Sequence, residues 1–280
     1  MAAPTNGSGR DVLLKFERVT VRYDETTALD AVDFEMRRGD TCVILGAAGS
    51  GKTVLLKTAL GLIQPDEGRV WLFGRNSQQV EADELRDLRG RLGILFQEGG
   101  LFDSLNIEEN VGYPLANQKS LRCPADEILP RVEEALKFVE LAHTLAKVPS
   151  ELSGGMRRRV GIARAIVTQP ELLLYDSPTA GLDPITATTI MALIAKERDI
   201  RHTTTALVTH RFQDGQLLAN YRYNAKTGRL ESIKPAGPDE EGYTRFLVMK
   251  QGTIVFEGSQ TELEAASDSY VAKFGKRMAD

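Results

Sequence analysis

A glycine-rich stretch near the front of the chain has the residue types and spacing to bind phosphate. It follows the pattern G-x-x-x-x-G-K-[ST], and its residues are Gly46, Ala47, Ala48, Gly49, Ser50, Gly51, Lys52 and Thr53. The apolar run Cys42–Leu45 precedes it and Val54–Leu56 follows it, which gives the order of strand, loop and helix that the pattern requires. We call residues 46–53 the phosphate loop.

The residue types of the phosphate loop each have a chemical role. Glycine permits backbone conformations that a Cβ would forbid, so successive N–H groups can turn towards phosphate oxygens. The Lys52 ammonium supplies charge for the β- and γ-phosphates, the Thr53 hydroxyl is a ligand for Mg²⁺, and the helix that starts near Thr53 adds its positive N-terminal dipole. A turn that only joins strand to helix is the alternative, but the complete pattern predicts nucleoside triphosphate binding.

A serine and a glycine pair begin a predicted helix farther along the chain. The run is Leu152, Ser153, Gly154, Gly155 and Met156. Serine is a favoured N-cap, and the glycines leave backbone N–H groups free to face an anion. Residues 153–155, which we call the Ser153 edge, therefore form a second phosphate-facing edge or a plain helix cap, and the phosphate loop upstream favours the first.

Polar side chains stand where predicted strands end. Asp176 ends one apolar run, Gln97 follows another, and Thr209 and His210 follow a third. Because ligands of open α/β sheets bind at the carboxyl ends of the strands, we expect these residues beside one site, with Asp176 on the Mg²⁺ side. Tyr23 ends the first predicted strand, where its ring suits stacking on adenine as well as an ordinary strand position.

The elements that position these residues predict an α/β fold with a β-rich entry. Leu13–Tyr23 and Ala31–Met36 alternate apolar and polar residues, which predicts an antiparallel pair leading into Cys42–Leu45. The predicted helices are Thr53–Leu62, Gln78–Arg91, Ile107–Leu115, Ile128–Ala146, the run after Ser153, and Ile185–Arg198. The predicted hairpins join Tyr221–Asn224 to Arg229–Lys234 and Phe246–Lys250 to Thr253–Glu257, before short helices at Gln260–Ala266 and Tyr270–Lys276.

Shifts in composition divide the chain into five parts. Residues 1–10 form a polar tail that we expect to be disordered. The parts that follow are a core that contains the phosphate loop and an antiparallel β subdomain (11–98 and 167–212), a helical subdomain (99–166), an inserted hairpin and linker (213–245), and a C-terminal hairpin with helices (246–280).

Composition excludes several classes of function. The 280 residues carry a net charge of −4 without a basic tail, which argues against nucleic acid as a partner. No apolar run is long enough to cross a bilayer and the first residues lack a signal peptide, so we expect a cytosolic chain whose membrane role comes through a partner protein. The two cysteines, Cys42 and Cys123, fit neither a disulfide framework nor a metal site.

From about Leu13 to Phe274 the chain resembles the ATP-binding subunit of an ABC transporter. The motifs that carry the resemblance are the phosphate loop, Gln97 after a strand, the run 152–156, and the Asp176 strand followed by His210. The resemblance implies an ABC-type P-loop NTPase with a RecA-like core, an antiparallel β subdomain and an inserted α-helical subdomain. It also implies that two such subunits hold each ATP between the phosphate loop of one and the Ser153 edge of the other.

The resemblance gives the matching positions their roles. It implies that Tyr23 stacks on adenine, that Thr53, Gln97 and Asp176 surround Mg²⁺, that His210 contacts the γ-phosphate, and that Asp183 communicates across the dimer. The Gln97 region and the helical subdomain would couple to an integral membrane permease, which would hold the chain at the cytoplasmic face of the membrane. Residues 95–102, Met156 and residues 181–185 look most like Mla or Mce-type lipid transport ATPases, although the stretch 221–242 exceeds what these usually carry.

One position departs from the family pattern. Ser177 stands directly after Asp176, where the family places a glutamate that polarises the attacking water. A serine hydroxyl is not a general base near neutral pH, and a positioned base contributes roughly 10²- to 10⁴-fold, so we expect binding to survive while hydrolysis slows.

Three interpretations of Ser177 stay open. The chain hydrolyses ATP slowly, with His210 and Gln97 holding the water; or it pairs with a different subunit that keeps its glutamate, so that the second ATPase subunit is a heterodimer partner and not a second copy; or Glu98 serves as the base. A separate functional alternative is a soluble ATP-gated clamp or regulatory switch that is not coupled to transport.

Overall fold

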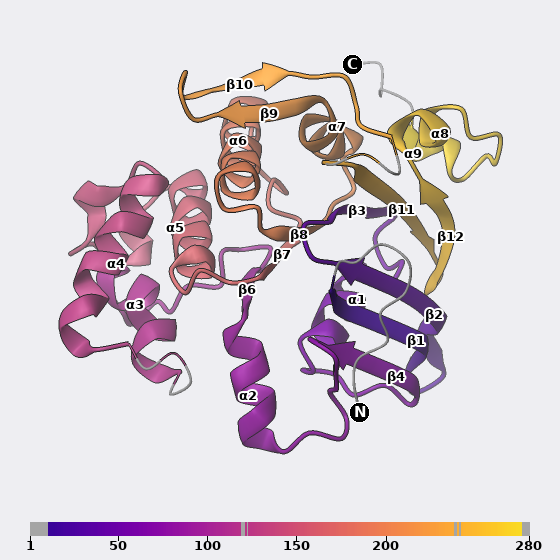
Figure 1. Cartoon of the computed structure of the whole chain (residues 1–280), viewed down its shortest axis with the longest axis horizontal. Coiled ribbons are helices and arrows are strands. Elements are labelled where there is room, and N and C mark those ends of the chain that lie inside the picture. The colour runs from indigo at the N-terminus through magenta and orange to yellow at the C-terminus, as the bar shows by residue number, and fades with distance from the viewer. Residues whose placement is uncertain (1–10, 119–120, 122, 238–239, 241, 276–280) are drawn as a thin grey trace.

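Two large sheets form the body of the protein in the computed structural model, which describes residues 11–118, 121, 123–237, 240 and 242–275. The first sheet is antiparallel and has the strand order β2-β1-β4-β5 (Figure 1). Its strands are β1 (Val12–Tyr23), β2 (Thr26–Arg37), β4 (Glu67–Leu72) and β5 (Arg75–Asn76). The antiparallel pairing of β1 with β2 confirms the prediction from alternating residues, because the inward side chains Phe16 and Phe34 meet edge to face.

The second sheet carries the strand ends where the predicted site lies. Its order is β12-β11-β3-β8-β7-β6, and its strands are β3 (Thr41–Gly46), β6 (Leu92–Leu95), β7 (Leu172–Asp176), β8 (Thr204–Val208), β11 (Thr244–Lys250) and β12 (Thr253–Gly258). The strands β11, β3, β8, β7 and β6 are parallel, and β12 is antiparallel to β11. Every residue of β3, β7 and β8 is buried, as expected of a parallel sheet covered on both faces.

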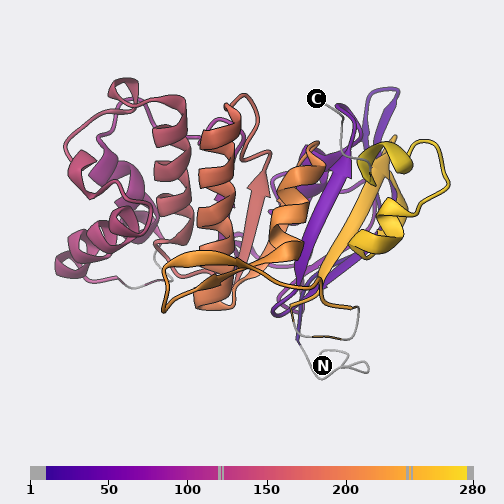
Figure 2. The same cartoon turned by 90° about the horizontal axis from the view of Figure 1, so that it is seen from above.

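Helices cover this sheet and form a separate group at one end of the molecule. The helices are α1 (Lys52–Ala59), α2 (Ala82–Gly90), α3 (Ile107–Asn117), α4 (Ala125–Phe138), α5 (Gly154–Ile166), α6 (Pro184–Arg201), α7 (Phe212–Asn220), α8 (Gln260–Glu264) and α9 (Ala272–Gly275). Helices α3, α4 and α5 pack together through Val111, Val132, Leu136 and Val160. Figures 1 and 2 both show this group on the side of the molecule away from the antiparallel sheet.

Helices α1 and α4 each end three or more residues earlier than the sequence predicted. Helix α1 ends at Ala59 and not at Leu62, because Gly61 has the left-handed φ of +65° that terminates helices. Helix α4 ends at Phe138 and not at Ala146, because Glu140 takes a left-handed φ of +63° and a short 3₁₀ turn follows at Ala142–Thr144. The apolar side chains of Val132, Ala135, Leu136 and Val139 in this region all lie in the core.

The C-terminal third contains both predicted hairpins. Strand β9 (Tyr221–Asn224) pairs with β10 (Arg229–Ser232) over α6 and α7, and β11 pairs with β12. Strand β11 also pairs in parallel with β3, a pairing that was not predicted from the sequence. The tail at residues 1–10 and part of the linker in 235–242 lie outside the described residues.

Two further features concern membrane spans and the cysteines. No helix within the described ranges has the length and apolar character needed to cross a membrane. Cys42 and Cys123 are both free thiols, the first buried in β3.

Candidate functional site

The phosphate loop connects β3 to α1 in a conformation that depends on its glycines. A Cβ on Gly46 would come within 2.6 Å of the Met249 carbonyl oxygen, and a Cβ on Gly51 would come within 2.5 Å of the Ala28 carbonyl oxygen. Gly51 also has a left-handed φ of +101° at the residue that caps α1. Residues 47–49 are exposed, so the loop presents its backbone to solvent while its two ends are tightly packed.

Lys52 is held at the centre of this loop. Its Nζ donates to the carbonyl oxygens of Gly46 at 2.8 Å and Ala47 at 2.7 Å and to Ser50 Oγ at 3.1 Å. Burial lowers the pKa of Lys52, and the nearby charge of Asp176 opposes that shift. The ammonium is therefore fixed in place by the loop itself, next to the carboxylate at the end of β7.

Asp176 and Ser177 lie where β7 ends. Asp176 is only 4% exposed and accepts a hydrogen bond from Ser177 Oγ at 3.2 Å. Ser177 has a left-handed φ of +49°, and its N–H donates to the carbonyl oxygen of Val208 at 2.8 Å. The side chain of Ser177 thus binds Asp176, the predicted Mg²⁺ ligand, and its backbone N–H binds the neighbouring strand β8.

The next strand end, after β8, carries His210. His210 is exposed, whereas Thr209 is buried and its hydroxyl donates to Asp214 Oδ2 at 2.7 Å. Asp214 also accepts from Thr179 Oγ1 at 2.6 Å, and its burial raises the pKa of its carboxyl group. Asp214, which was not predicted from the sequence, connects the segment after Ser177 to the segment before His210.

Gln97 follows β6 in an exposed turn with Glu98. Because β6 ends at Leu95, Gln97 and Glu98 lie outside the strand. The rule that successive side chains of a strand point to opposite faces of the sheet therefore does not apply to them. Arg164 of α5 donates to the carbonyl oxygens of Gly99 at 3.1 Å and Gly100 at 2.7 Å, which ties this turn to the helical group.

The Ser153 edge begins α5 as a true helix cap. Ser153 Oγ accepts from the Met156 N–H at 3.2 Å, and Gly154 and Gly155 are the first helical residues. A Cβ on Gly155 would come within 2.5 Å of Thr186 Cγ2. Thr186 is itself capped by Asp183, whose Oδ1 accepts from the Ile185 and Thr186 N–H groups. The structure therefore brings the Ser153 edge and Asp183 together.

The predicted residues fall into two groups. The phosphate loop, Asp176, Gln97 and His210 stand at the carboxyl edge of the parallel strands, and Thr53 is exposed on the first turn of α1. The Ser153 edge and Asp183 lie at the starts of α5 and α6, and Figure 1 shows α5 among the other helices and apart from α1. Tyr23, at the end of β1, is 48% exposed.

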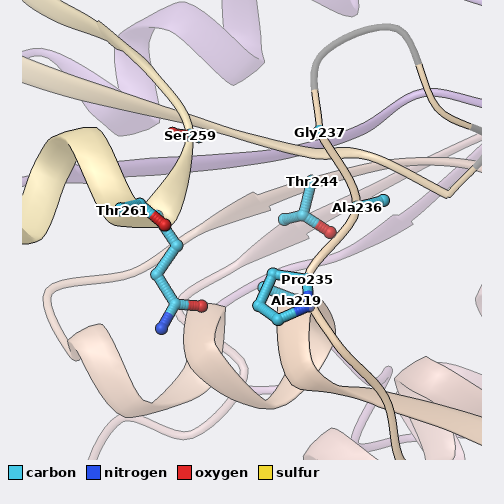
Figure 3. Close-up of a pocket in the computed structure, with 8 residues that line it drawn as sticks. Ala219, Pro235, Ala236, Gly237, Thr244, Ser259 and Thr261 are labelled. Carbon is cyan, nitrogen blue, oxygen red and sulfur yellow. The ribbon is translucent and has the colours of Figure 1, made fainter.

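The donor atoms around the loop fit a triphosphate with Mg²⁺, because Lys52 supplies a cation and Thr53 and Asp176 supply oxygen donors. The described residues contain no cluster of three or more metal-ligating side chains. A small pocket elsewhere lies between α7, the segment 235–237 and α8 (Figure 3), and none of its lining residues belongs to the predicted site.

Comparison with known proteins decides the family. The family model described as ABC transporter matches residues 29–180. The chain belongs to the ABC transporter family. It is an ATP-binding subunit of that family and an ATPase.

The relatives of this ABC ATPase include two proteins named for lipids. It is 34% identical over 278 residues to the chloroplastic protein trigalactosyldiacylglycerol 3 of Arabidopsis thaliana, covering 96% of this chain and 75% of that protein. It is 33% identical over 268 residues to the intermembrane phospholipid transport system ATP-binding protein MlaF of Haemophilus influenzae, covering 96% and 92% of the two chains.

A solved ABC cassette shares the fold. The ATP-binding cassette MJ0796, solved as a dimer in a post-hydrolysis state bound to ADP and Pi, superposes with a TM-score of 0.71 at 29% identity, covering 88% of this chain and 98% of that one. The α/β fold predicted from the sequence, with its parallel core and helical subdomain, is thereby confirmed.

Proposed function

We propose that this ABC ATPase drives a lipid transporter of the Mla or Mce type, by closing with a second ATPase subunit around ATP and moving an integral membrane permease. The main support is the separation of the two groups of site residues. The phosphate loop and the Ser153 edge both present groups suited to phosphate, yet they belong to different parts of one chain. A second subunit would bring its Ser153 edge to the nucleotide held by this loop.

Each group of side chains has a role in this proposal. The Lys52 ammonium neutralises charge on the β- and γ-phosphates, and Thr53, Gln97 and Asp176 supply oxygen ligands for Mg²⁺. When bound, Mg²⁺ neutralises the charge that develops on the phosphate oxygens. His210 contacts the γ-phosphate, Tyr23 stacks on adenine, and Asp183 communicates across the dimer with the second subunit.

The carboxylate that the family uses as general base is replaced in this chain by Ser177. Its hydroxyl binds Asp176, so Ser177 orders the Mg²⁺ ligand but does not accept the proton of the attacking water. We infer slow hydrolysis, with His210 and Gln97 orienting the water. A partner subunit with its own glutamate, or Glu98 as base, are the two other sources of activity.

Steady-state ATPase of Ser177→Glu and Glu98→Gln variants separates these sources. A large gain in Ser177→Glu supports slow intrinsic hydrolysis, and loss of activity in Glu98→Gln supports Glu98 as base. An inactive chain that gains activity only beside another ATPase subunit supports the heterodimer.

The lipid class is supported by similarity to two proteins whose names refer to lipids, over 96% of this chain in each case. The permease would hold the chain at the cytoplasmic face of the membrane as a peripheral subunit. No nucleic acid partner is proposed, because the net charge is −4.

Affinity purification from detergent-solubilised native membranes tests the coupling. The tagged chain should carry an integral membrane protein with it, and the complex in phospholipid vesicles should hydrolyse ATP faster than the same complex in detergent alone. The matched control is Lys52→Ala, which should keep the membrane partner but lose the ATPase. A chain that binds ATP and elutes without any membrane protein would favour the soluble clamp.

A further inference from the structure

The hydroxyl of Tyr270, near the C-terminus, lies against the phosphate loop. Tyr270 Oη donates to the Met249 carbonyl oxygen at 2.9 Å and accepts from the Ala47 N–H at 3.2 Å. Ala47 directly follows Gly46, which ends β3, and Met249 is paired with Gly46 in β11. One side chain therefore joins Met249 in β11 to the Ala47 N–H of the phosphate loop.

The position of this side chain is fixed from several directions. Asp268 Oδ1 accepts from the N–H groups of Tyr270 and Val271, both at 2.9 Å, in a turn that presents the tyrosine. The ring packs edge to face on Phe274 with 5.2 Å between centroids, and Lys250 Nζ lies 5.1 Å from the Tyr270 ring centroid. A hydroxyl held in this way can constrain the loop that it contacts.

The Gly46–Ala47 peptide transmits this constraint to Lys52. The described chain has no cis peptide bond, and in a trans peptide the C=O and N–H groups point in opposite directions. Tyr270 binds the N–H of this peptide, while its carbonyl oxygen, that of Gly46, accepts from Lys52 Nζ at 2.8 Å. Fixing the N–H therefore fixes the carbonyl that holds the ammonium.

The same C-terminal hairpin contacts the loop at a second point. The Gly252 N–H, in the turn between β11 and β12, donates to the Ser50 carbonyl oxygen at 3.1 Å. The C-terminal hairpin and Tyr270 thus hold the loop at Ala47 and at Ser50. Residues 47–49 are exposed and remain open to a ligand.

We propose that Tyr270 is a positioning residue that preorganises the phosphate loop and Lys52 for ATP before the nucleotide arrives. The inference rests on the proposed role of Lys52 in binding the phosphates. A loop ordered in advance loses less conformational freedom on binding, so Tyr270 acts on ATP affinity. Once bound, the phosphates order the loop themselves, so the rate of the chemical step should depend little on Tyr270.

The test removes the hydroxyl and keeps the ring. In full-length Tyr270→Phe, the Kd for ATP, measured by competition with a fluorescent trinitrophenyl-ATP, should rise about three- to tenfold, the effect of one hydrogen bond. The KM for ATP should rise by the same factor while kcat changes less than about twofold. Tyr113→Phe, an exposed tyrosine on α3, is the matched control and should bind ATP as the parent does.

A second variant tests whether the effect passes through the tyrosine. Asp268→Ala loosens the turn that presents Tyr270, so it should weaken ATP binding by a smaller factor, and it should add little in the Tyr270→Phe background. Simple additivity of the two effects would overturn the proposal, because it would mean that Asp268 and Tyr270 act independently.

Two further outcomes would also overturn it. An unchanged Kd in Tyr270→Phe, in a protein where Lys52→Ala raises the Kd for ATP about tenfold or more, would reject the role of Tyr270 and leave the proposed function intact. A parent chain that binds no ATP would reject both.

Discussion

Lys52 illustrates how a buried cation can be kept ready for an anionic ligand. Its ammonium is taken out of water, which lowers its pKa, and its three donors are satisfied by the phosphate loop at 2.7–3.1 Å. These oxygens compensate the loss of hydration without neutralising the charge. The positive charge is therefore available to phosphate oxygens, next to the exposed loop residues 47–49.

Replacing this cation should remove nucleotide affinity without unfolding the protein. In Lys52→Ala we expect the Kd for ATP to rise about 10- to 100-fold, as for the loss of hydrogen bonds to a charged group. The measurement is the same fluorescent competition titration. Lys57→Ala, an exposed lysine on the same helix, should leave the Kd unchanged, and parental affinity in Lys52→Ala would contradict the site.

Ser177 leads to the second prediction at the scale of the residue. The backbone already holds a non-glycine residue at a φ of +49°, so a glutamate meets no new backbone strain. In Ser177→Glu a carboxylate would stand beside Asp176, and we expect kcat to rise by about 10²-fold or more. Ser177→Gln has the same size without a base and should not gain activity. Equal activities of the two variants would contradict the assignment.

At the scale of the element, α6 contains a carboxyl group that should link stability to pH. Glu197 is fully buried, and burial raises the pKa of its carboxyl group from 4.5 to about 7, although Arg201 and Thr203 partly oppose the shift. The folded state then binds a proton that the unfolded state releases between about pH 4.5 and 7. The free energy of unfolding therefore falls as the pH rises through this window.

Substituting Glu197 should remove this dependence. Relative to Glu197→Gln, the parent should lose about 1–3 kcal/mol of unfolding free energy between pH 4.5 and 7.5, as measured by urea denaturation. Glu133→Gln, on the exposed face of α4, is the control and should follow the parent at each pH. Parallel stability curves for the parent and Glu197→Gln would show that Glu197 does not titrate in this window.

The elements also show what the sequence could predict and why it fell short elsewhere. The phosphate loop, the strand ending at Asp176 and the Ser153 cap were predictable, because each depends on residues that are adjacent in the chain. Gly61 was a readable stop signal for α1. The end of α4 was not, because the left-handed residue there is Glu140 and the apolar spacing continues past it.

Contacts between distant segments had no sequence signal. The parallel pairing of β11 with β3 joins residues about 200 positions apart. The apolar run Phe246–Met249 predicts a buried strand but does not indicate which strand lies beside it. The bond between Tyr270 and Ala47 spans 223 positions. Such pairings depend on how the whole chain packs, which no local pattern encodes.

At the scale of the whole molecule, the separation of the phosphate loop from the Ser153 edge leads to a prediction about the proposed second subunit. The Ser153 edge packs beside Thr186 and Asp183, and the phosphate loop contacts β11 and the segment containing Tyr270. If each nucleotide lies between the loop of one copy and the edge of another, two different defects in two copies should complement each other.

Lys52→Ala removes the loop's cation, and Ser153→Asp keeps a good N-cap on α5 but adds a negative charge that repels phosphate. Neither variant alone should dimerise on adding Mg²⁺ and ATP in analytical ultracentrifugation. An equimolar mixture should dimerise, because a mixed pair has one site in which both the loop and the opposing edge are intact. Ser153→Asn keeps the cap without the charge and should dimerise like the parent. If the parent dimerises while the mixture stays as monomeric as either variant, the nucleotide is not shared between copies and each chain must complete its own site.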